Sequence, residues 1–568
     1  MRHTLSKLPR LVAISALMAL IVPSVVAYTP SFLNTKGEST QDIPLGPIMG
    51  VGRMTFNESQ MEVVDVYAGG PGASAGLLVG DIVTGVNGNE FVTYRRSNST
   101  GGEGAPEDIG RAILAAQAGG DPVVLNLRGK DDVTLALPPL PDFIRGYPTA
   151  DCERTQMQIR ANAEWLAERQ RPNGSWARDY ATAFAGLALL ATGDDKYLPH
   201  IQRTAGLFNT NYDLGGSPTT EGLLNEPGSN WDIPAAGIFL AEYILATGDT
   251  RVARALRHNC ERMYARLCQR TGRLGHGTTY LPYDGKGLVM PNVHSHVMWS
   301  LADHAGYPID PAGWALSWKS VEAAIRNNAV GYNFSAPGGY QGGGRTGLMV
   351  TAFGLRGTSN TTARNLGRWL GEHYREFPDA HAMTTTGLVM GLCGLRNANE
   401  RDWRNAMDYK RWMWALATPD DPSVRSFYFP SKSNIGGDSY LNMELSGVWM
   451  TLLSLAAYRD DTLWIFGNRE KGWLTGREVA SINDGTERLP RAGIRPESIP
   501  GLDDAVNPAT QHVRTIRNRE GRAIQARIVN ADSEMVVLEN PGDNRIFNVR
   551  LDSLSLEDQE AIRRDFDL

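Results

Sequence analysis

The chain has 568 residues, of which 42% are hydrophobic and 21% charged, and its formal net charge is -6. A chain of this length exceeds what one hydrophobic core usually organises, so we expect two to four domains. The acidic balance, without clustered Lys and Arg, argues against nucleic-acid binding, because phosphate recognition needs concentrated positive charge.

The N-terminus has the layout of a secretory signal. Basic Arg2, Lys7 and Arg10 precede an apolar run over residues 11–26, which ends at the small residue Ala27. This pattern predicts a signal peptide over the first 27 residues, with an uncleaved anchor as the alternative. No later apolar run reaches the ~18 residues that a membrane span needs. We therefore expect a secreted or periplasmic protein with no transmembrane segment after cleavage.

The next segment carries the strongest local motif. Residues 72–88 combine a small-residue turn, a Gly80-Asp81 bend, an apolar strand and Asn87-Gly88, a dipeptide typical of tight hairpins. This order resembles a PDZ domain, which we place at 40–140.

The PDZ resemblance implies a peptide-binding groove. In that family a glycine-bearing loop before the second strand holds a peptide carboxylate, and the peptide adds to the sheet as a strand. Pro47 departs from the usual loop because it lacks an N–H, so the alternative is a domain that only packs against its neighbour. The implied peptide-binding residues are Leu45, Gly46, Ile48, Met49, Gly50 and Val51.

All 13 tryptophans fall between Trp165 and Trp473, which marks 150–474 as a different domain. Two of its apolar segments end in the same Ala-Thr-Gly-Asp, so one helical unit is repeated. Charged amphipathic helices alternate with helices that are apolar nearly all round, as outer and buried inner layers do. The expected outer helices are 154–168, 196–208, 250–268, 311–328, 361–375 and 400–417, and the inner ones are 180–190, 234–245, 292–303, 346–355, 384–395 and 440–458. Roughly six of each predict an all-α (α/α)6 toroid.

The loops of this domain differ in length by position. Those entering the inner helices are long and rich in Gly and aromatic residues, whereas those leaving them are short. Because the chain alternates direction, all long loops must lie at one end of the toroid. We expect any functional face at that end, around the N-termini of the inner helices.

The toroid segment is similar to the α/α-toroid superfamily, and its run from Gln170 to Trp176 resembles the Gln/Trp repeats of terpene cyclases. The Asp-x-Asp-Asp motif of those cyclases and the Asp/Cys/His zinc set of prenyltransferases are absent, so neither activity is implied. The whole layout resembles uncharacterised secreted proteins of planctomycete and verrucomicrobial type, in which a PDZ domain precedes such a toroid.

After a Pro-punctuated linker at 475–511, the sequence alternates as short strands with turns at Gly521 and Pro541-Gly542. A helix then begins at Ser555, with Asp558 in a capping-box-like position. The segment 512–564 resembles an SH3-like β-barrel of the Sla-homology type, which implies a binding or docking module.

The four cysteines do not suggest a disulfide framework. On one helix, Cys260 and Cys268 would be ~12 Å apart, too far for a bond. We expect buried thiols, with at most one long-range bridge that could involve Cys152 or Cys393.

Glu444 is the leading candidate for chemistry. It lies about six residues into an inner helix, ~9 Å below the open face, where loss of solvent would raise its pKa for general acid work. Asp438 is the candidate base, and the alternative for Glu444 is a structural hydrogen bond. Further candidates at the open end are His296, His381, Arg345, Asp284 and Tyr283. Flat aromatic rings beside carboxylates suit sugars, and those predicted at this face also include Trp176, Trp231, Tyr280, Tyr340 and Tyr428.

Several of these residues have structural alternatives. Asp438, Asp179 and Asp232 each begin a helix, and N-capping would explain all three. Glu242, near the far end of its helix, is expected to be structural.

The histidines and glycines are equally ambiguous. His294 and His296 point about 200° apart on a helix, so one would face the lumen and the other outward. His276, His296 and His381 have no metal-site spacing, and we predict neither a metal nor a cofactor. Glycines 338–344 would let a ligand approach Arg345, which could hold a carboxylate, although loop flexibility explains them as well.

Three functions remain open. The first is binding or cleavage of a glycan at the toroid's open face, by a glycoside hydrolase or polysaccharide lyase-like activity. The second is a non-enzymatic peptide- or protein-binding adaptor of the cell envelope, and a weaker third is lipid or isoprenoid binding. A cleft with two or more convergent carboxylates would favour the enzyme. A lumen filled by side chains would favour the adaptor, and a deep dry lumen would favour lipid binding.

Overall fold

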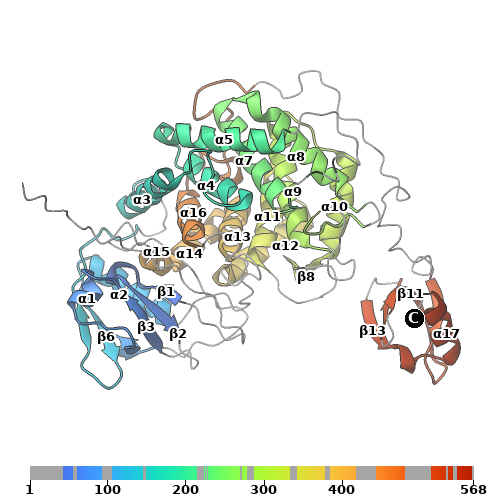
Figure 1. Cartoon of the computed structure of the whole chain (residues 1–568), viewed down its shortest axis with the longest axis horizontal. Helices are drawn as coiled ribbons and strands as arrows, with labels where there is room; N and C mark the ends of the chain where they lie inside the picture. Colours follow the sequence, from blue (N-terminus) through green and yellow to red (C-terminus); the bar gives the residue numbers. More distant parts are fainter. Residues whose placement is uncertain are drawn as a thin grey trace, which may run out of the picture.

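The computed structural model describes residues 42–54, 60–91, 105–144, 149–213, 223, 226, 228–268, 271–277, 287–332, 342–377, 384–417, 443–479, 513–531, 535–541 and 546–565. Figure 1 shows an N-terminal β-rich domain, a central helical domain and a C-terminal β segment. In the part of the chain just specified, no helix is both long enough and apolar enough to cross a bilayer.

The N-terminal domain is a sheet in the order β1-β2-β3-β4-β6-β7, with β5 paired to β4. Asn87 and Gly88 connect β4 to β5 with φ values of 51° and 77°, so the hairpin turn predicted there is confirmed. The strands are β1 (Asp42–Pro44), β2 (Gly50–Met54), β3 (Met61–Val66), β4 (Ile82–Val86), β5 (Asn89–Glu90), β6 (Val123–Leu127) and β7 (Val133–Leu135), and the helices are η1 (Gly46–Ile48), α1 (Pro71–Ser74) and α2 (Ala105–Gln117).

The central domain alternates inner and outer helices as the sequence predicts. The inner helices are α4 (Asp179–Ala191), α7 (Asp232–Thr247), α9 (Val289–His304), α11 (Gly343–Leu355), α13 (Thr384–Ala398) and α16 (Met443–Ala456). The outer helices are α3 (Glu153–Arg169), α5 (Leu198–Tyr212), α8 (Ala253–Ala265), α10 (Pro311–Ala323), α12 (Thr361–His373) and α14 (Glu400–Tyr409). Each inner helix contacts the next, and α16 contacts α4, so the ring closes.

Two predicted outer helices end earlier than expected. α10 stops at Ala323, and a β-hairpin of β8 (Ile325–Arg326) and β9 (Ala329–Val330) follows. The predicted helix 400–417 breaks at Lys410, after which the short helix α15 (Arg411–Leu416) begins. α15 contacts α2 and η1 of the N-terminal domain.

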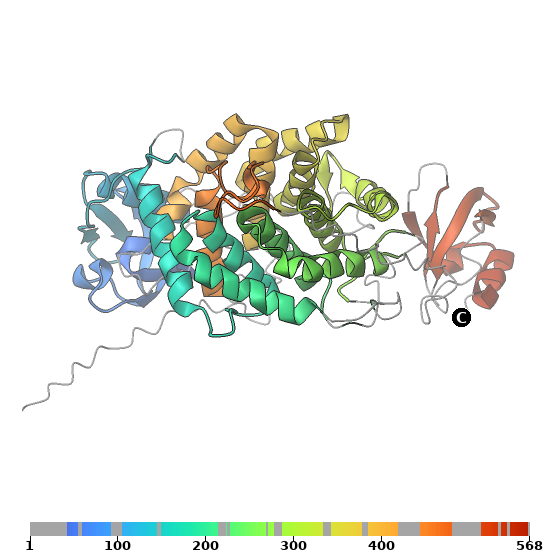
Figure 2. The same cartoon turned by 90° about the horizontal axis from the view of Figure 1, so that it is seen from above.

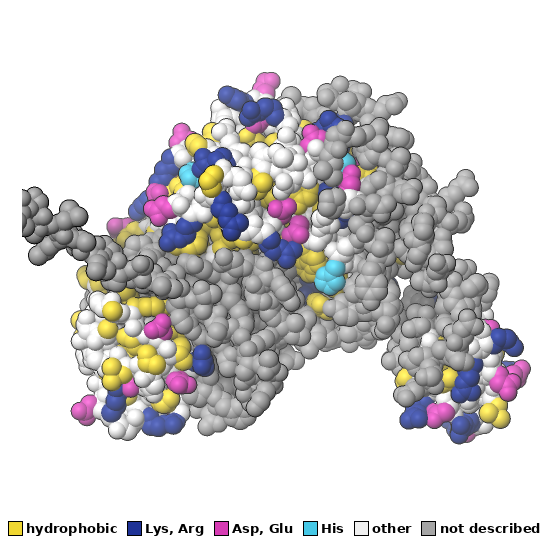
Figure 3. Space-filling model, viewed as in Figure 1, with side chains coloured by type: hydrophobic (Ala, Val, Ile, Leu, Met, Phe, Trp, Pro, Cys, Tyr) yellow, Lys and Arg dark blue, Asp and Glu magenta, His cyan; other side chains and the backbone are white. Residues whose placement is uncertain are grey.

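The inner helices are buried on all sides because small residues let their backbones approach. In α7 every side chain from Ile233 to Thr247 is buried. At the contact between α11 and α13, a Cβ on Gly347 would overlap the carbonyl of Met390. The outer helices keep a solvated face, on which positive and negative side chains are interspersed in the view of Figure 3.

The C-terminal end of the inner ring is closed by the segment 459–476, which crosses it in Figure 2 and includes η6 (Trp464–Phe466). Gly472 N–H donates to Leu245 O at 2.7 Å, and Leu474 N–H donates to Ala246 O at 3.0 Å. These donors satisfy carbonyls that a helix end leaves without an intrahelical partner. The opposite end, where the inner helices begin, therefore holds the candidate face.

The C-terminal segment is an antiparallel meander of β10 (Val513–Arg517), β11 (Ala523–Ala531), β12 (Met535–Glu539) and β13 (Ile546–Arg550), followed by η9 (Leu551–Ser553) and α17 (Leu556–Asp565). The backbone N–H of Asp558 donates to Ser555 Oγ at 3.2 Å, as the predicted cap requires. Its SH3-like barrel stays a prediction. All four cysteines are buried and free, which confirms the prediction of unpaired thiols.

Candidate active site at the open rim of the toroid

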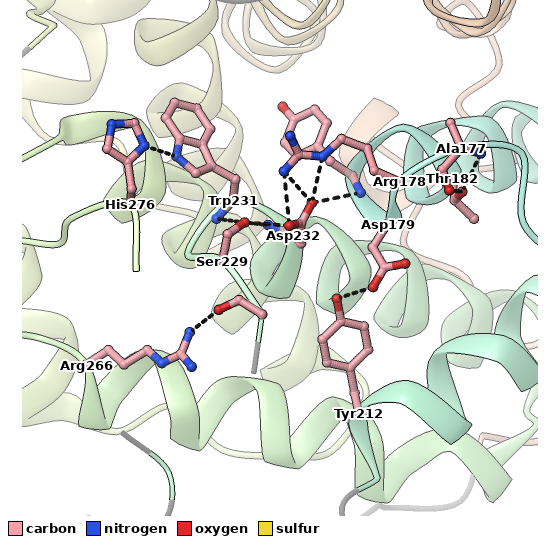
Figure 4. A network of polar contacts seen from close by, with 12 residues as sticks. Ala177, Arg178, Asp179, Thr182, Tyr212, Ser229, Trp231, Asp232, Arg266 and His276 are labelled. Atoms are coloured by element: carbon pink, nitrogen blue, oxygen red, sulfur yellow. Dashed lines mark hydrogen bonds and ion pairs between the residues drawn. The ribbon is translucent and has the colours of Figure 1, made fainter. Parts of the chain in front are cut away.

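Asp232, the first residue of α7, is the centre of a polar network at this rim (Figure 4). Its carboxylate accepts Arg178 Nη2 at 2.9 and 3.0 Å, and Ser229 Oγ at 2.5 Å. It also accepts the backbone N–H of Tyr180, on the neighbouring helix α4, at 3.1 Å. Asp232 therefore links the beginnings of two adjacent inner helices.

Asp179, the first residue of α4, is the second carboxyl of this rim. Tyr212, from α5, donates its hydroxyl to Asp179 Oδ2 at 2.7 Å. Burial raises the pKa of the Asp179 carboxyl, the Tyr212 hydrogen bond opposes that rise, and the negative charge of Asp232 adds to it. Asp179 therefore keeps its proton to higher pH than an exposed aspartate does.

The prediction that Asp179 and Asp232 act as N-caps is wrong. The N-cap positions are Arg178 and Trp231, and neither makes a side-chain cap bond. Each aspartate stands one position inside its helix, so its carboxyl is directed to neighbouring elements. There it still lies near the positive end of the helix dipole, which favours a carboxylate.

An aromatic pair lies next to Asp232. Trp231 Nε1–H donates to His276 Nδ1 at 3.0 Å, and the two ring planes are inclined by 28° with their centroids 5.9 Å apart. Trp231 is half-buried and His276 is exposed. Asn230 fixes the loop of His276 by donating to Gly275 O and Gly277 O. The prediction that Trp231 lies at the open end is confirmed, and His276 lies beside it.

Below the rim the lumen is filled by side chains of the inner helices. The Tyr180 hydroxyl lies 3.1 Å from His294 Nε2 and 3.0 Å from Thr386 Oγ1, and all three residues are fully buried. His294 Nδ1 lies 3.0 Å from Met290 O. Because a carbonyl only accepts, Nδ1 carries the proton and Nε2 accepts from Tyr180. Burial lowers the pKa of His294 to about 4, so the ring is neutral at physiological pH.

The two histidines of α9 point in different directions, as predicted. His294 faces the lumen, whereas His296 packs edge-on against Trp314 of the outer layer, with ring centroids 4.1 Å apart. Burial lowers the pKa of His296 to about 3. The structure thus places His296 in the wall between two helix layers, and not beside the rim carboxyls.

No three His, Cys, Asp or Glu side chains within the described ranges are grouped closely enough to hold a metal ion. His381 lies outside those ranges.

Arg345 occupies the third position of α11, at the rim end, but is only 3% exposed. Its Nε donates to Val330 O at 3.4 Å, and its guanidinium lies 5.5 Å from the centre of the Tyr332 ring. Burial lowers its pKa to about 10, so it stays charged. Arg345 therefore stabilises the contact between the end of β9 and the start of α11.

Other predicted residues divide between the core and the parts that the structure leaves undescribed. Trp176 is 5% exposed and donates to Leu166 O, so it belongs to the core and not to the rim. Glu242 is structural, as predicted, because its carboxylate accepts Trp464 N–H at 3.0 Å and Ile465 N–H at 2.9 Å. Glu444 lies in the first turn of α16, with its side chain outside the described part. Asp438, Asp284, Tyr283, Tyr280, Tyr340 and Tyr428 also lie outside it.

The predicted peptide-binding loop is buried at an interdomain contact. Leu45 and Ile48 are fully buried, and Met49 and Val51 are 8% and 1% exposed. The loop faces α15 of the toroid, so the structure matches the alternative in which this domain packs against its neighbour.

Five residues of the site were not predicted from the sequence: Arg178, Tyr180, Tyr212, Ser229 and Thr386. Arg178-Asp179 just before an apolar helix was a visible signal for the first of them. Tyr212 and Thr386 come from other helices, and no sequence spacing links them to Asp179.

A family model described as "Domain of unknown function (DUF6288)" matches residues 156–467, and a PDZ domain model matches residues 62–97. No curated protein matches the chain.

Among solved structures, the chain is similar to the GH76A alpha-1,6-mannanase from Salegentibacter sp. HEL1_6, with 12% identity and a TM-score of 0.38 over 53% of this chain and 98% of that one. It is also similar to an unsaturated glucuronyl hydrolase specific for heparin, with 10% identity and a TM-score of 0.38 over 54% and 97%.

Proposed function

The chain belongs to the DUF6288 family, and we propose that it is an exported glycoside hydrolase whose reaction takes place at the rim between α4 and α7. The observation that carries this proposal is the pair of carboxyls on adjacent helix N-termini, Asp179 and Asp232, in contrasting environments. Pairs whose surroundings differ in this way commonly divide the roles of acid and base.

In the proposed reaction Asp179 is the general acid. Burial raises its pKa, which favours the protonated form that a general acid needs, and the Tyr212 hydroxyl donates a hydrogen bond to it. It gives its proton to the glycosidic oxygen as the bond from that oxygen to the anomeric carbon breaks. A water molecule adds to the anomeric carbon, and Asp232 accepts the proton that this water loses.

The neighbouring side chains fit that assignment. Arg178 and Ser229 hold the Asp232 carboxylate in place, and Trp231 presents part of an aromatic face beside it. Flat aromatic faces stack on sugar rings, and the half-exposed Trp231 can do so without rearrangement of the core. Export follows from the predicted signal peptide and stays part of the proposal.

The test is a panel of polysaccharides and aryl glycosides assayed with purified protein. We expect Asp179→Asn and Asp232→Asn each to lower kcat by roughly 10²–10⁴-fold while the thermal unfolding curve stays close to that of the unmodified chain. Asp310→Asn is the matched control, because Asp310 caps the outer helix α10 and asparagine caps equally well. Full activity in Asp179→Asn would contradict the proposal. If only Glu444→Gln lost activity, the general acid would instead be Glu444 of α16.

A non-enzymatic adaptor is the second candidate, and one observation favours it. Below the rim the lumen is plugged, with Phe184 and Trp449 stacked at 4.8 Å between centroids. A rim that binds an oligosaccharide with equal affinity in the unmodified chain and in Asp179→Asn, without turnover in either, would favour the adaptor.

A further inference from the structure

The edge of β2 that a PDZ ligand would use is already paired. β2 pairs with β3 on one side, at Gly50↔Val66, and with β1 on the other, at Asp42↔Arg53, Ile43↔Gly52 and Pro44↔Val51. A peptide that adds as a strand needs a free edge. β1 runs antiparallel to β2 and leads into the loop, so the chain itself takes the strand position.

The loop that would hold a peptide carboxylate faces the toroid. Gly46 stands at φ +55°, and a Cβ there would lie 2.5 Å from Ala415 O of α15. No side chain larger than glycine fits between this loop and α15. The toroid therefore covers the position of the ligand's carboxylate.

Helix α2, the other wall of a PDZ groove, makes the same contact. A Cβ on Gly110 would lie 2.6 Å from Trp412 O and 3.0 Å from Trp412 Cβ. The Tyr409 hydroxyl donates to Glu107 Oε2 at 3.3 Å. Trp412 itself is 1% exposed, as a core residue is.

These contacts lie where the first and last hairpins of the ring meet. Arg154 of α3, the first toroid helix, donates to Gln117 Oε1 of α2 at 2.7 Å and is 2% exposed. Gln158 of α3 donates to Trp414 O of α15 at 3.0 Å. Helix α2 thus contacts both α3 of the first hairpin and α15 of the last.

We propose that the PDZ domain is a clasp for the toroid: its groove holds α15 of the same chain, and α2 ties the first hairpin of the ring to the last. Its partner is the toroid and not an external peptide. The buried Arg154–Gln117 bond and the glycines at both points of close approach are what a permanent internal contact needs.

Gly110→Ala tests the clasp in the full-length chain. The methyl group would be forced into α15, although alanine favours the helix α2 in which it lies. We expect amide hydrogen exchange in α3 and α15 to become about tenfold faster, while exchange in α8 and α9 across the ring is unchanged. Gly206→Ala is the matched control, because Gly206 lies in α5 with open space around it.

Tyr409→Phe is a milder variant that keeps the ring and removes one hydrogen bond, and we expect a smaller acceleration in the same helices. Unchanged exchange in α3 and α15 of both variants would overturn the clasp, and so would equal acceleration throughout the ring. Binding is measured with synthetic peptides that end in a free-carboxylate valine. Saturable binding of these peptides to the unmodified chain at the β2 edge would also overturn it.

Discussion

Asp232 Oδ1 accepts the backbone N–H of Tyr180 across the contact between α7 and α4, at 3.1 Å. The same carboxylate pairs with Arg178, so one side chain serves three donors when Ser229 is included. Asp232→Ala removes an acceptor from each, and we expect the free energy of unfolding to fall by about 1–3 kcal/mol. Asp232→Asn keeps an oxygen that accepts the N–H of Tyr180, so it should lower the free energy of unfolding by less than Asp232→Ala does. Urea denaturation measures both, and equal losses would show that the hydrogen bond to Tyr180 contributes little.

The pKa of Asp179 should respond in opposite directions to changes in its two neighbours. Tyr212→Phe removes the hydrogen bond that lowers this pKa, so the pKa should rise further. Asp232→Asn removes the negative charge that raises it, so the pKa should fall. Carboxyl carbon NMR titration measures both shifts. A shift in the same direction for both variants would contradict the arrangement of the rim.

Glu242 should make stability depend on pH near neutrality. Burial raises the pKa of its carboxyl from 4.5 to about 7 in the folded chain, so folding favours the protonated form. Its contribution is therefore complete below about pH 4.5 and is lost as the pH rises through 7. Over this pH range the contribution of Glu242 to the free energy of unfolding falls by roughly 3 kcal/mol. We expect the stability difference between the unmodified chain and Glu242→Gln to change over this window, and a constant difference would refute the assignment.

His296 should be replaceable with a gain in stability. Neither ring nitrogen has a hydrogen-bond partner within the described residues, although the ring is fully buried beside Trp314. Phenylalanine fills a similar shape without a polar atom, so His296→Phe should raise the free energy of unfolding by about 1–2 kcal/mol. His294→Phe is the matched comparison and should lower it, because both nitrogens of that ring have partners. If His296→Phe instead abolished an activity of the folded chain, the sequence prediction of a catalytic His296 would regain support.

The alternation of charged and apolar segments determined the helical ring in advance. Apolar residues on all sides of 234–245 predicted a helix that the structure buries from Ile233 to Thr247. The opposed directions of His294 and His296 followed from the angle per residue of an α-helix. The helix break at Lys410 was missed because residues 400–417 keep a helical composition through it. The hairpin after Ala323 did have a signal, Asn327-Asn328, whose residues take φ values of 50° and 62° in its turn.

What the sequence could not decide was which side chains meet. Asp179 and Asp232 were visible as helix-start residues, but only the closed ring brings Tyr212 to the first and Tyr180 to the second. The PDZ resemblance predicted an open groove, yet β1 and α15 fill it. Periodicity fixes which face of a helix is buried, because burial is decided residue by residue along one element. It does not fix the partner on that face, which depends on how elements distant in the chain are rotated and stacked against one another.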